Sequence, residues 1–180
     1  MSGIYILGGI AKGRRLGAVP SGVRPSPVRL RRALFEILGD IEDLHFFDLF
    51  AGTGAVGIEA LSRGARDVVF VDKSRRACLA VQKNIRAAGL SDYGYEIVQE
   101  DAISWLDSHI VVGDEIIFAA PPYEKEIMEK SIASFQKLFS EVDGGIMAIL
   151  QIHRRFMPDD FIIEPKRIHK VSEDLLLIWY

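Results

Sequence analysis

The chain has 180 residues, of which 49% are hydrophobic and 26% charged, and its net charge is −3. This balance is typical of a globular protein, and the length suits one well-packed domain, which we expect over residues 1–180. No apolar run approaches the roughly 18 residues that a membrane-spanning helix needs, so we expect no membrane partner. Cys78 is the only cysteine, which excludes an intrachain disulfide and favours the cytoplasm. The four histidines lie far apart without metal-ligand spacing, so we expect no bound metal.

The first 40 residues predict a β-hairpin followed by a helix. Short strands are expected at 3–7 and 14–19, around a turn rich in glycine. A helix is expected from Pro27 to about Leu38, with Ser26 as its N-cap.

The same segment concentrates positive charge. Residues 1–36 contain seven basic side chains and one acidic one, Glu36, on a chain that is otherwise acidic. Lys and Arg are the side chains that bind phosphates, so the cluster indicates contact with a polyanion. A solvated arm followed by a solvated helix face explains the same charges. Charge alone does not separate the two interpretations.

From His45 onward, strands alternate with helices. Apolar runs predict strands at 45–50, 67–72, 94–99, 114–119 and 145–151. Helices are expected between them at 54–63, 74–89, 101–108 and 124–139. This alternation predicts a doubly wound, mostly parallel α/β sheet. Residues 160–170 and 174–180 have no helix between them, so we expect an antiparallel hairpin that completes a seven-stranded sheet.

The strongest local signal is the segment Asp48-Leu49-Phe50-Ala51-Gly52-Thr53-Gly54, in which a strand ends in glycines and a helix follows at once. Glycines let the backbone turn sharply and let a ligand approach closely. Asp72 ends the next strand, where a carboxylate can accept hydrogen bonds from both hydroxyls of a ribose. The pattern therefore predicts a nucleoside site. It also satisfies the dinucleotide pattern Gly-x-Gly-x-x-Gly, so it does not by itself separate NAD from S-adenosylmethionine.

Three further features favour S-adenosylmethionine. Asp48 precedes the glycine loop, where its carboxylate would repel a pyrophosphate but suit the ammonium of a methionyl group. Asp101 follows the third strand, the position from which class I methyltransferases contact the adenine amino group. The fourth strand ends in Ala120-Pro121-Pro122-Tyr123, at the crevice where such sheets bind substrate. Each feature also has a structural explanation (a helix-capping acid, an N-cap, a strand terminator), but their joint occurrence on consecutive strands favours a site.

The glycine loop and the Pro-Pro-Tyr sequence resemble those of amino-group methyltransferases whose fourth strand ends in (Asp/Asn)-Pro-Pro-(Tyr/Phe). The opening Ile6-Leu7-Gly8-Gly9…Gly13-Arg14-Arg15-Leu16 and the later Arg24-Pro25-Ser26…Arg29-Leu30-Arg31…Leu34-Phe35 resemble the bacterial RsmD-type branch specifically. That branch methylates N2 of a guanine in 16S ribosomal RNA. The resemblance covers nearly the whole chain. It implies a class I methyltransferase (Rossmann-like) fold, with residues 1–40 facing the RNA and residues 41–180 forming the cofactor-binding catalytic core.

The resemblance also implies the site residues and the partners. S-adenosylmethionine, which leaves as S-adenosylhomocysteine, is expected to be bound by Asp48, Phe50, Gly52, Gly54, Asp72, Lys73, Asp101 and Ala102. The catalytic segment is expected to be Ala120, Pro121, Pro122 and Tyr123, in which the Pro121 carbonyl accepts a hydrogen bond from the target amine and Tyr123 stacks on the extruded base. RNA phosphates are expected to contact Arg14, Arg24, Arg29 and Arg31. The implied partner is 16S ribosomal RNA, free or within the assembling 30S subunit, and the implied enzyme is a monomer.

Two positions depart from the family. Arg32 lies near a position that is usually acidic, and Ala120 replaces the Asp or Asn of the catalytic motif. Alanine cannot accept a hydrogen bond from the amine, so turnover is expected to be roughly 10²–10³ lower. Two other functions therefore stay open. The first is a catalytically silent RNA-binding relative, which Ala120 favours, and the second is an NAD-dependent oxidoreductase, which Asp48 and the Pro-Pro-Tyr sequence disfavour.

Overall fold

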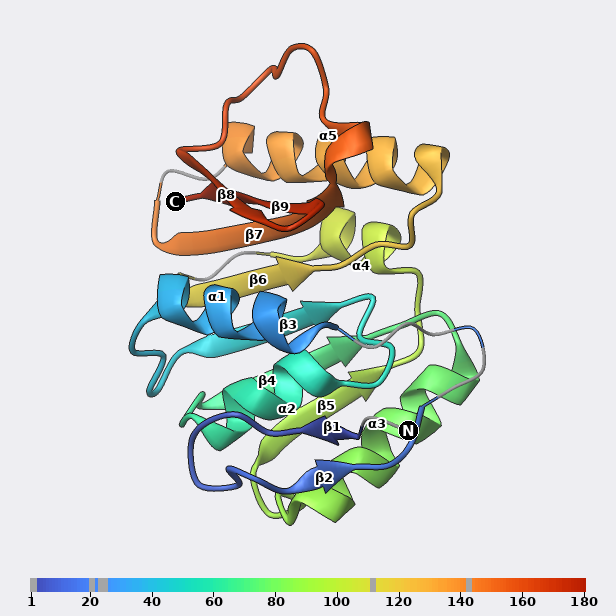
Figure 1. Ribbon diagram of the computed structural model, residues 1–180. Coiled ribbons are helices and arrows are strands. Elements are labelled where there is room, and N and C mark those ends of the chain that lie inside the picture. Colours follow the sequence, from blue (N-terminus) through green and yellow to red (C-terminus); the bar gives the residue numbers. More distant parts are fainter. Residues whose placement is uncertain (1–2, 20–21, 23–25, 111–112, 142–143) are drawn as a thin grey trace.

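A seven-stranded sheet organises the computed structural model of the protein (Figure 1), which describes residues 3–19, 22, 26–110, 113–141 and 144–180. In chain order the strands are β3 (His45–Leu49), β4 (Asp67–Val71), β5 (Gly94–Val98), β6 (Glu115–Ala119), β7 (Ile146–His153), β8 (Arg167–Val171) and β9 (Asp174–Trp179). They lie in the order β5-β4-β3-β6-β7-β9-β8. The first five strands in this order are parallel, and β9 runs antiparallel to both β7 and β8. The predicted sheet and its C-terminal antiparallel hairpin are therefore confirmed.

Helices cover both faces of this sheet. They are α1 (Val28–Leu38), α2 (Ala55–Ser62), α3 (Arg75–Ala88), α4 (Ala102–Ser108) and α5 (Lys125–Glu141). Successive side chains of a strand point to opposite faces. Phe46 accordingly packs into an apolar cluster with α1, α2 and α3, whereas Phe47 packs into a second cluster with α4 and α5. Figure 1 shows the resulting three layers, with α1, α2 and α3 on one side of the sheet and α5 on the other.

The order of the strands reverses at β3. The chain adds β4 and β5 on one side of β3, and then adds β6 and β7 on its other side. In doubly wound sheets, ligands bind in the crevice outside the carboxyl ends of the strands at such a reversal. The crevice here lies between the ends of β3 and β6, which are followed by the glycine loop and by Ala120-Pro121-Pro122-Tyr123.

Glycines determine how the chain enters α2 and how closely α2 lies against the sheet. Gly54 is the N-cap of α2 and has a φ of 72°, in the left-handed region that glycine tolerates best. A Cβ at Gly57 would lie 2.3 Å from Cε1 of Phe70 on β4. A larger residue at position 57 would therefore push α2 away from the sheet.

The N-terminal hairpin packs on the face of the sheet that α2 and α3 cover. Its strands β1 (Ile4–Tyr5) and β2 (Arg15–Leu16) pair antiparallel and are shorter than predicted. Ile4, Ile6 and Leu16 belong to the same buried cluster as Phe46, so the hairpin and the sheet share a core.

A buried carboxylate links the hairpin to two helices. Glu59 on α2 is fully buried, and its Oε2 accepts a hydrogen bond from the Leu7 backbone N–H at 2.7 Å. The same oxygen lies 3.4 Å from Nη1 of Arg31 on α1, while Oε1 pairs with Arg63 Nη2 at 2.9 Å. Arg31 Nη1 also donates to the Tyr5 carbonyl at 2.9 Å. Burial lowers the pKa of Arg31, and the Glu59 carboxylate opposes that shift.

Two local predictions were wrong. Ser26 is not the N-cap of α1, because Pro27 takes that position and makes no side-chain cap bond. The last hairpin starts at Arg167 rather than at residue 160. Pro165 interrupts the earlier stretch, and a proline cannot donate to a β-ladder.

In the described ranges, no helix is both long and apolar enough to cross a membrane. The same ranges contain no group of three or more His, Cys, Asp or Glu side chains placed to hold a metal ion.

Candidate active site

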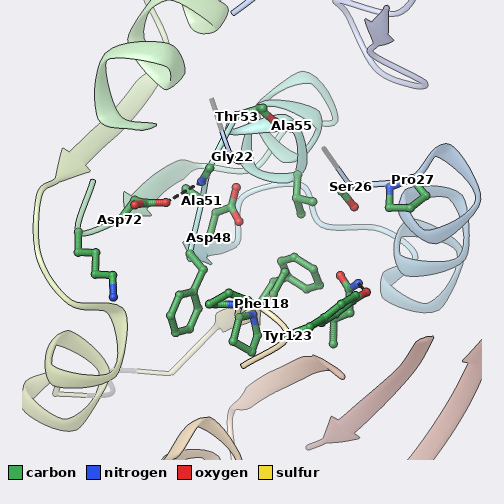
Figure 2. Close-up of a pocket in the computed structure, with 18 residues that line it drawn as sticks. Gly22, Ser26, Pro27, Asp48, Ala51, Thr53, Ala55, Asp72, Phe118 and Tyr123 are labelled. Carbon is green, nitrogen blue, oxygen red and sulfur yellow. Dashed lines mark hydrogen bonds between the residues drawn. The ribbon is translucent and has the colours of Figure 1, made fainter. Parts of the chain in front are cut away.

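A cavity of about 370 Å³ lies at the carboxyl ends of β3, β4, β6 and β7, within the range of roughly 300–1,000 Å³ typical of small-ligand sites. We define its loop side as Asp48, Phe50, Gly52, Asp72 and Lys73, all of which line it. We define its motif side as Ala120, Pro121, Pro122, Tyr123 and Gln151, which also line it. Figure 2 shows Asp48 and Asp72 on one side of the cavity and Tyr123 on another. The structure thus brings together two segments that the sequence analysis singled out separately.

Backbone amides hold the Asp72 carboxylate on the loop side. Its Oδ2 accepts a hydrogen bond from Gly52 N at 2.9 Å, the dashed line of Figure 2, and its Oδ1 accepts from Ser74 N at 2.8 Å. Phe50 has a φ of 59°, in a region that non-glycine residues rarely adopt. Such strained residues persist where the surroundings hold them and cluster at ligand sites. The Asp72 carboxylate thus ties the glycine loop to the residues that follow β4.

Asp48 is a buried carboxylate facing the same cavity. It is 2% exposed, and its Oδ2 accepts a hydrogen bond from Gly57 N at 2.9 Å. Burial raises the pKa of Asp48 to about 8, which the Gly57 hydrogen bond opposes and the nearby Asp72 carboxylate reinforces. A cavity-lining carboxyl with a pKa raised this far is typical of a functional site. A cationic group placed beside it would restore its charge.

The motif side is held by side chains from β7, from the turn that follows it (Arg154–Phe156) and from β9. The Tyr123 hydroxyl donates a hydrogen bond to Asp174 Oδ1 and lies 3.4 Å from Gln151 Nε2, which donates to it. Arg155 Nη2 donates to the Tyr123 carbonyl at 3.1 Å, and the His153 ring meets the Tyr123 ring edge-on at 5.4 Å between centroids. The phenol ring is thus fixed in orientation beside the cavity.

Three predicted cofactor residues do not line the cavity. Gly54 acts through its backbone, because its left-handed φ lets the loop turn into α2. Asp101 is the N-cap of α4, where Oδ1 accepts hydrogen bonds from Ile103 N at 3.1 Å and Ser104 N at 3.2 Å. Ala102 is buried in the first turn of the same helix. A contact of Asp101 or Ala102 with the cofactor stays a prediction.

The predicted RNA contacts divide into three groups. Arg14 and Arg29 are exposed, and Arg14 Nη1 also donates to the Ala88 carbonyl at 2.8 Å. Arg31 was predicted to bind phosphate, and this was wrong, because its side chain is only 1% exposed and pairs with Glu59. Arg31 lies on the inner face of α1 among apolar residues. The sequence analysis took it for a surface charge because it is basic. Arg24 lies outside the described residues.

Ser26 and Gln151 are among the cavity-lining residues that the sequence analysis did not assign to the site. Ser26 lines the cavity, and its buried Oγ has no hydrogen-bond partner among the described residues. Gln151 lies near the end of β7 and is 6% exposed. A single polar residue inside the apolar run Ala148-Ile149-Leu150-Gln151-Ile152 was the available signal for Gln151. Its importance depends on which strand lies beside β7, and the sequence pattern alone does not give that pairing.

Known proteins resemble this chain in sequence over most of its length. A family model described as "Conserved hypothetical protein 95" matches residues 4–160. The chain is 35% identical over 134 residues to ribosomal RNA small subunit methyltransferase D of Buchnera aphidicola subsp. Acyrthosiphon pisum, an alignment that covers 73% of this chain and 69% of the relative. It is also 35% identical over 131 residues to the protein of the same name from Escherichia coli K12, covering 72% of this chain and 65% of that relative.

Solved structures share the fold. A hypothetical protein of Thermus thermophilus is 30% identical with a TM-score of 0.75, and 98% of each chain is covered. An RNA methyltransferase of Salinibacter ruber, solved in complex with S-adenosylhomocysteine, is 20% identical with a TM-score of 0.63, covering 87% of this chain and 92% of that one. At this identity the likeness shows the class I methyltransferase fold alone. Because the family model spans most of the chain and the curated relatives agree with it, the chain belongs to the Conserved hypothetical protein 95 family, that of the RsmD-type methyltransferases.

Proposed function

We propose that this protein transfers a methyl group from S-adenosylmethionine to the exocyclic N2 amine of a guanine in 16S ribosomal RNA. The observation that carries the proposal is that the loop side and the motif side line one shared cavity. One side offers two carboxylates suited to a cationic nucleoside, and the other offers the Pro-Pro-Tyr sequence typical of amine methylation. The family relatives named as ribosomal RNA methyltransferases support the RNA substrate.

The loop side fits S-adenosylmethionine by its charge and its polar groups. The Asp72 carboxylate is held by Gly52 N and Ser74 N at the end of β4, where it can accept hydrogen bonds from ribose hydroxyls. Asp48 provides a negative charge for the methionyl ammonium once a cation offsets the effect of burial. The buried Ser26 Oγ has no hydrogen-bond partner among the described residues, as expected of a group that a ligand satisfies. When bound, the cofactor supplies a methyl group on a sulfonium.

The motif side fits a flipped purine base. Tyr123 presents a half-buried ring that Asp174, Arg155 and His153 fix in orientation, as a stacking platform for an extruded base requires. The family resemblance assigns the Pro121 carbonyl to accept a hydrogen bond from the target amine. Such a bond turns the nitrogen lone pair away from the ring and toward the methyl group.

The basic N-terminal segment leads to this cavity. Gly22, Ser26 and Pro27 line it, and exposed arginines lie on both sides of this connection, Arg14 on the hairpin and Arg29 on α1. RNA phosphates held there would place a neighbouring base at the cavity, because phosphate contacts fix position rather than sequence. We propose that the enzyme acts in the cytoplasm as a monomer, with Arg14, Arg24 and Arg29 on the RNA of the assembling 30S subunit.

The test is methyl transfer from isotope-labelled S-adenosylmethionine to unmodified 16S RNA and to 30S particles, followed by digestion to nucleosides. We expect label in N2-methylguanosine, with Asp72→Ala as the cofactor-deficient control. Label in another methylated nucleoside would overturn the guanine assignment and keep amine methylation. No label in either substrate, from a folded protein that binds the cofactor, would favour the RNA-binding relative that Ala120 suggests.

A further inference from the structure

Two neighbouring strands place Ala120 and Gln151 next to each other at the motif side. β6 and β7 pair in parallel with Ala119 opposite Leu150. The next residues are Ala120, which directly follows β6, and Gln151 on β7, and both line the cavity. Gln151 thus lies at the position from which a side chain can reach the space that the missing Asp or Asn of the motif would occupy.

The hydrogen bonds around Tyr123 determine which end of the Gln151 amide remains for a ligand. The single hydroxyl proton of Tyr123 is donated to Asp174. The phenol oxygen can then only accept, so Gln151 must offer its NH₂ group, as it does at 3.4 Å. Reversing the amide would place two acceptors against each other. The network therefore assigns the amide nitrogen to Tyr123 and leaves the amide oxygen for the cavity.

The amide is also restricted in its motion. Gln151 is 6% exposed on a strand with parallel and antiparallel neighbours on its two sides. Gln151 also lines the cavity, so a ligand bound there can offer a hydrogen-bond donor to the amide oxygen. An exocyclic amine has such donors in its N–H groups.

We propose that Gln151 supplies the side-chain hydrogen-bond acceptor for the target amine, the role that Ala120 cannot fill. This inference rests on the proposed function. The amine nitrogen uses its lone pair to form the new N–C bond as the S–C bond breaks, with those electrons passing to sulfur. The nitrogen then loses one proton to water. Gln151 takes no proton, and accepts only the hydrogen bond that orients the nitrogen and stabilises its developing positive charge.

An amide oxygen carries no net charge, so it stabilises that developing charge less than a carboxylate would. The protein should therefore be active but slower than a variant that carries an acidic acceptor. Asp174 is not placed for this part, because it does not line the cavity, and its Oδ1 accepts the Tyr123 proton. The structure thus accounts for a motif that lacks its acidic residue while retaining the geometry around it.

The test is a double-mutant cycle of methyl transfer to 16S RNA under single-turnover conditions. Gln151→Leu, which removes the acceptor at similar volume, should lower the transfer rate by roughly 10². Affinity for S-adenosylmethionine and for RNA should change little, because the lost interaction forms mainly in the transition state. Ala120→Asp should raise the rate by roughly 10² or more in the Gln151→Leu background, and by a clearly smaller factor in the wild-type background.

A matched control separates this role from general destabilisation. Gln136 on α5 is equally 6% exposed, and its Oε1 accepts a hydrogen bond from Ile162 N at 3.3 Å, away from the cavity. Gln136→Leu should leave the transfer rate near the wild-type value. An unchanged rate in Gln151→Leu, or an equal gain from Ala120→Asp in both backgrounds, would overturn the inference while the proposed function stands. Absence of transfer in every variant would remove the proposed function, and the inference with it.

Discussion

The two sides of the cavity are built in different ways. On the loop side, Asp48 and Asp72 are held by backbone N–H groups of Gly57, Gly52 and Ser74. On the motif side, the Tyr123 hydroxyl donates to Asp174 and accepts from Gln151, so side chains of three separate segments hold one another. An ordinary substitution leaves the backbone N–H groups in place, whereas it can replace any side chain of a hydrogen-bonded network. The loop side should therefore tolerate little change, and the motif side can replace one acceptor by another.

The largest expected effect comes from the buried carboxyl of the loop side. The pKa of Asp48 is about 8 in the folded protein, above its value of about 4 in an unfolded chain. The stability that this raised pKa supports is fully present below pH 4 and is lost as the pH rises toward 8. Asp48→Asn keeps an acceptor for Gly57 N and removes the ionisation. It should thus raise the free energy of unfolding above pH 8, by at most on the order of 5 kcal/mol.

Urea unfolding of both proteins between pH 4 and pH 9 measures this effect. The two curves should lie close together at pH 4 and separate as the pH rises. The same variant should bind S-adenosylmethionine more weakly, because the neutral amide cannot pair with an ammonium. If the stability difference stays constant across the pH range, Asp48 is not the buried acid that the structure describes.

These residues also show what the sequence could predict. Asp48, Gly52 and Asp72 were proposed as site residues because the strand, the glycine loop and the next strand follow one another in the chain. A local sequence pattern is sufficient to find such consecutive segments. Gln151 was missed because its role comes from the pairing of β6 with β7. Arg31 was assigned to RNA because composition does not distinguish an inward from an outward position on a helix. The alternation of elements predicted a doubly wound, mostly parallel sheet, whereas the pairing of β6 with β7 and the contacts between distant segments did not follow from it.

The next effect concerns α1, which belongs to neither side of the cavity. Arg31→Ala should lower the free energy of unfolding by about 3 kcal/mol, because it leaves the buried Glu59 without one of its partners. Arg29 lies two residues earlier and is exposed, so Arg29→Ala should leave stability within about 0.5 kcal/mol. Arg29→Ala should instead weaken RNA binding and reduce its dependence on salt.

Urea unfolding measures the stability of both variants, and RNA binding at several salt concentrations measures their salt dependence. The effects should separate, with stability changed by one substitution and the salt slope by the other. Equal loss of stability in both variants would mean that α1 does not depend on the Arg31–Glu59 contact that the structure shows. An unchanged salt slope in Arg29→Ala would make that residue a solvated charge.

A smaller effect is expected at the ribose position of the loop side. Asp72→Ala removes the carboxylate that Gly52 N and Ser74 N hold, and each lost hydrogen bond to a charged group is worth on the order of 1.5–3 kcal/mol. Affinity for S-adenosylhomocysteine, measured by calorimetry, should fall at least about tenfold. The matched control is Asp67→Ala at the opposite end of β4, where the carboxylate pairs with His45 at 2.8 Å. Equal affinity in Asp72→Ala and wild type would show that the ligand does not use this side.

The smallest effect, on the motif side, tests whether its side-chain network works as a unit. Asp174→Ala removes the acceptor of the Tyr123 proton, so the hydroxyl can donate to the Gln151 amide oxygen instead. That oxygen would then be engaged within the protein and less available to the target amine. The methyl-transfer rate should fall about five- to tenfold, the effect of one hydrogen bond of about 1 kcal/mol, while affinity for S-adenosylhomocysteine stays unchanged.

Asp174→Asn retains a side-chain oxygen that can accept the phenol proton, so its rate should lie closer to wild type. Ala120→Asp should make the Asp174→Ala loss smaller, because a carboxylate directly after β6 would orient the amine without Gln151. A rate loss that is equal for Asp174→Ala and Asp174→Asn, and that Ala120→Asp does not reduce, would mean that Asp174 acts on the position of the Tyr123 ring and not on the direction of the amide.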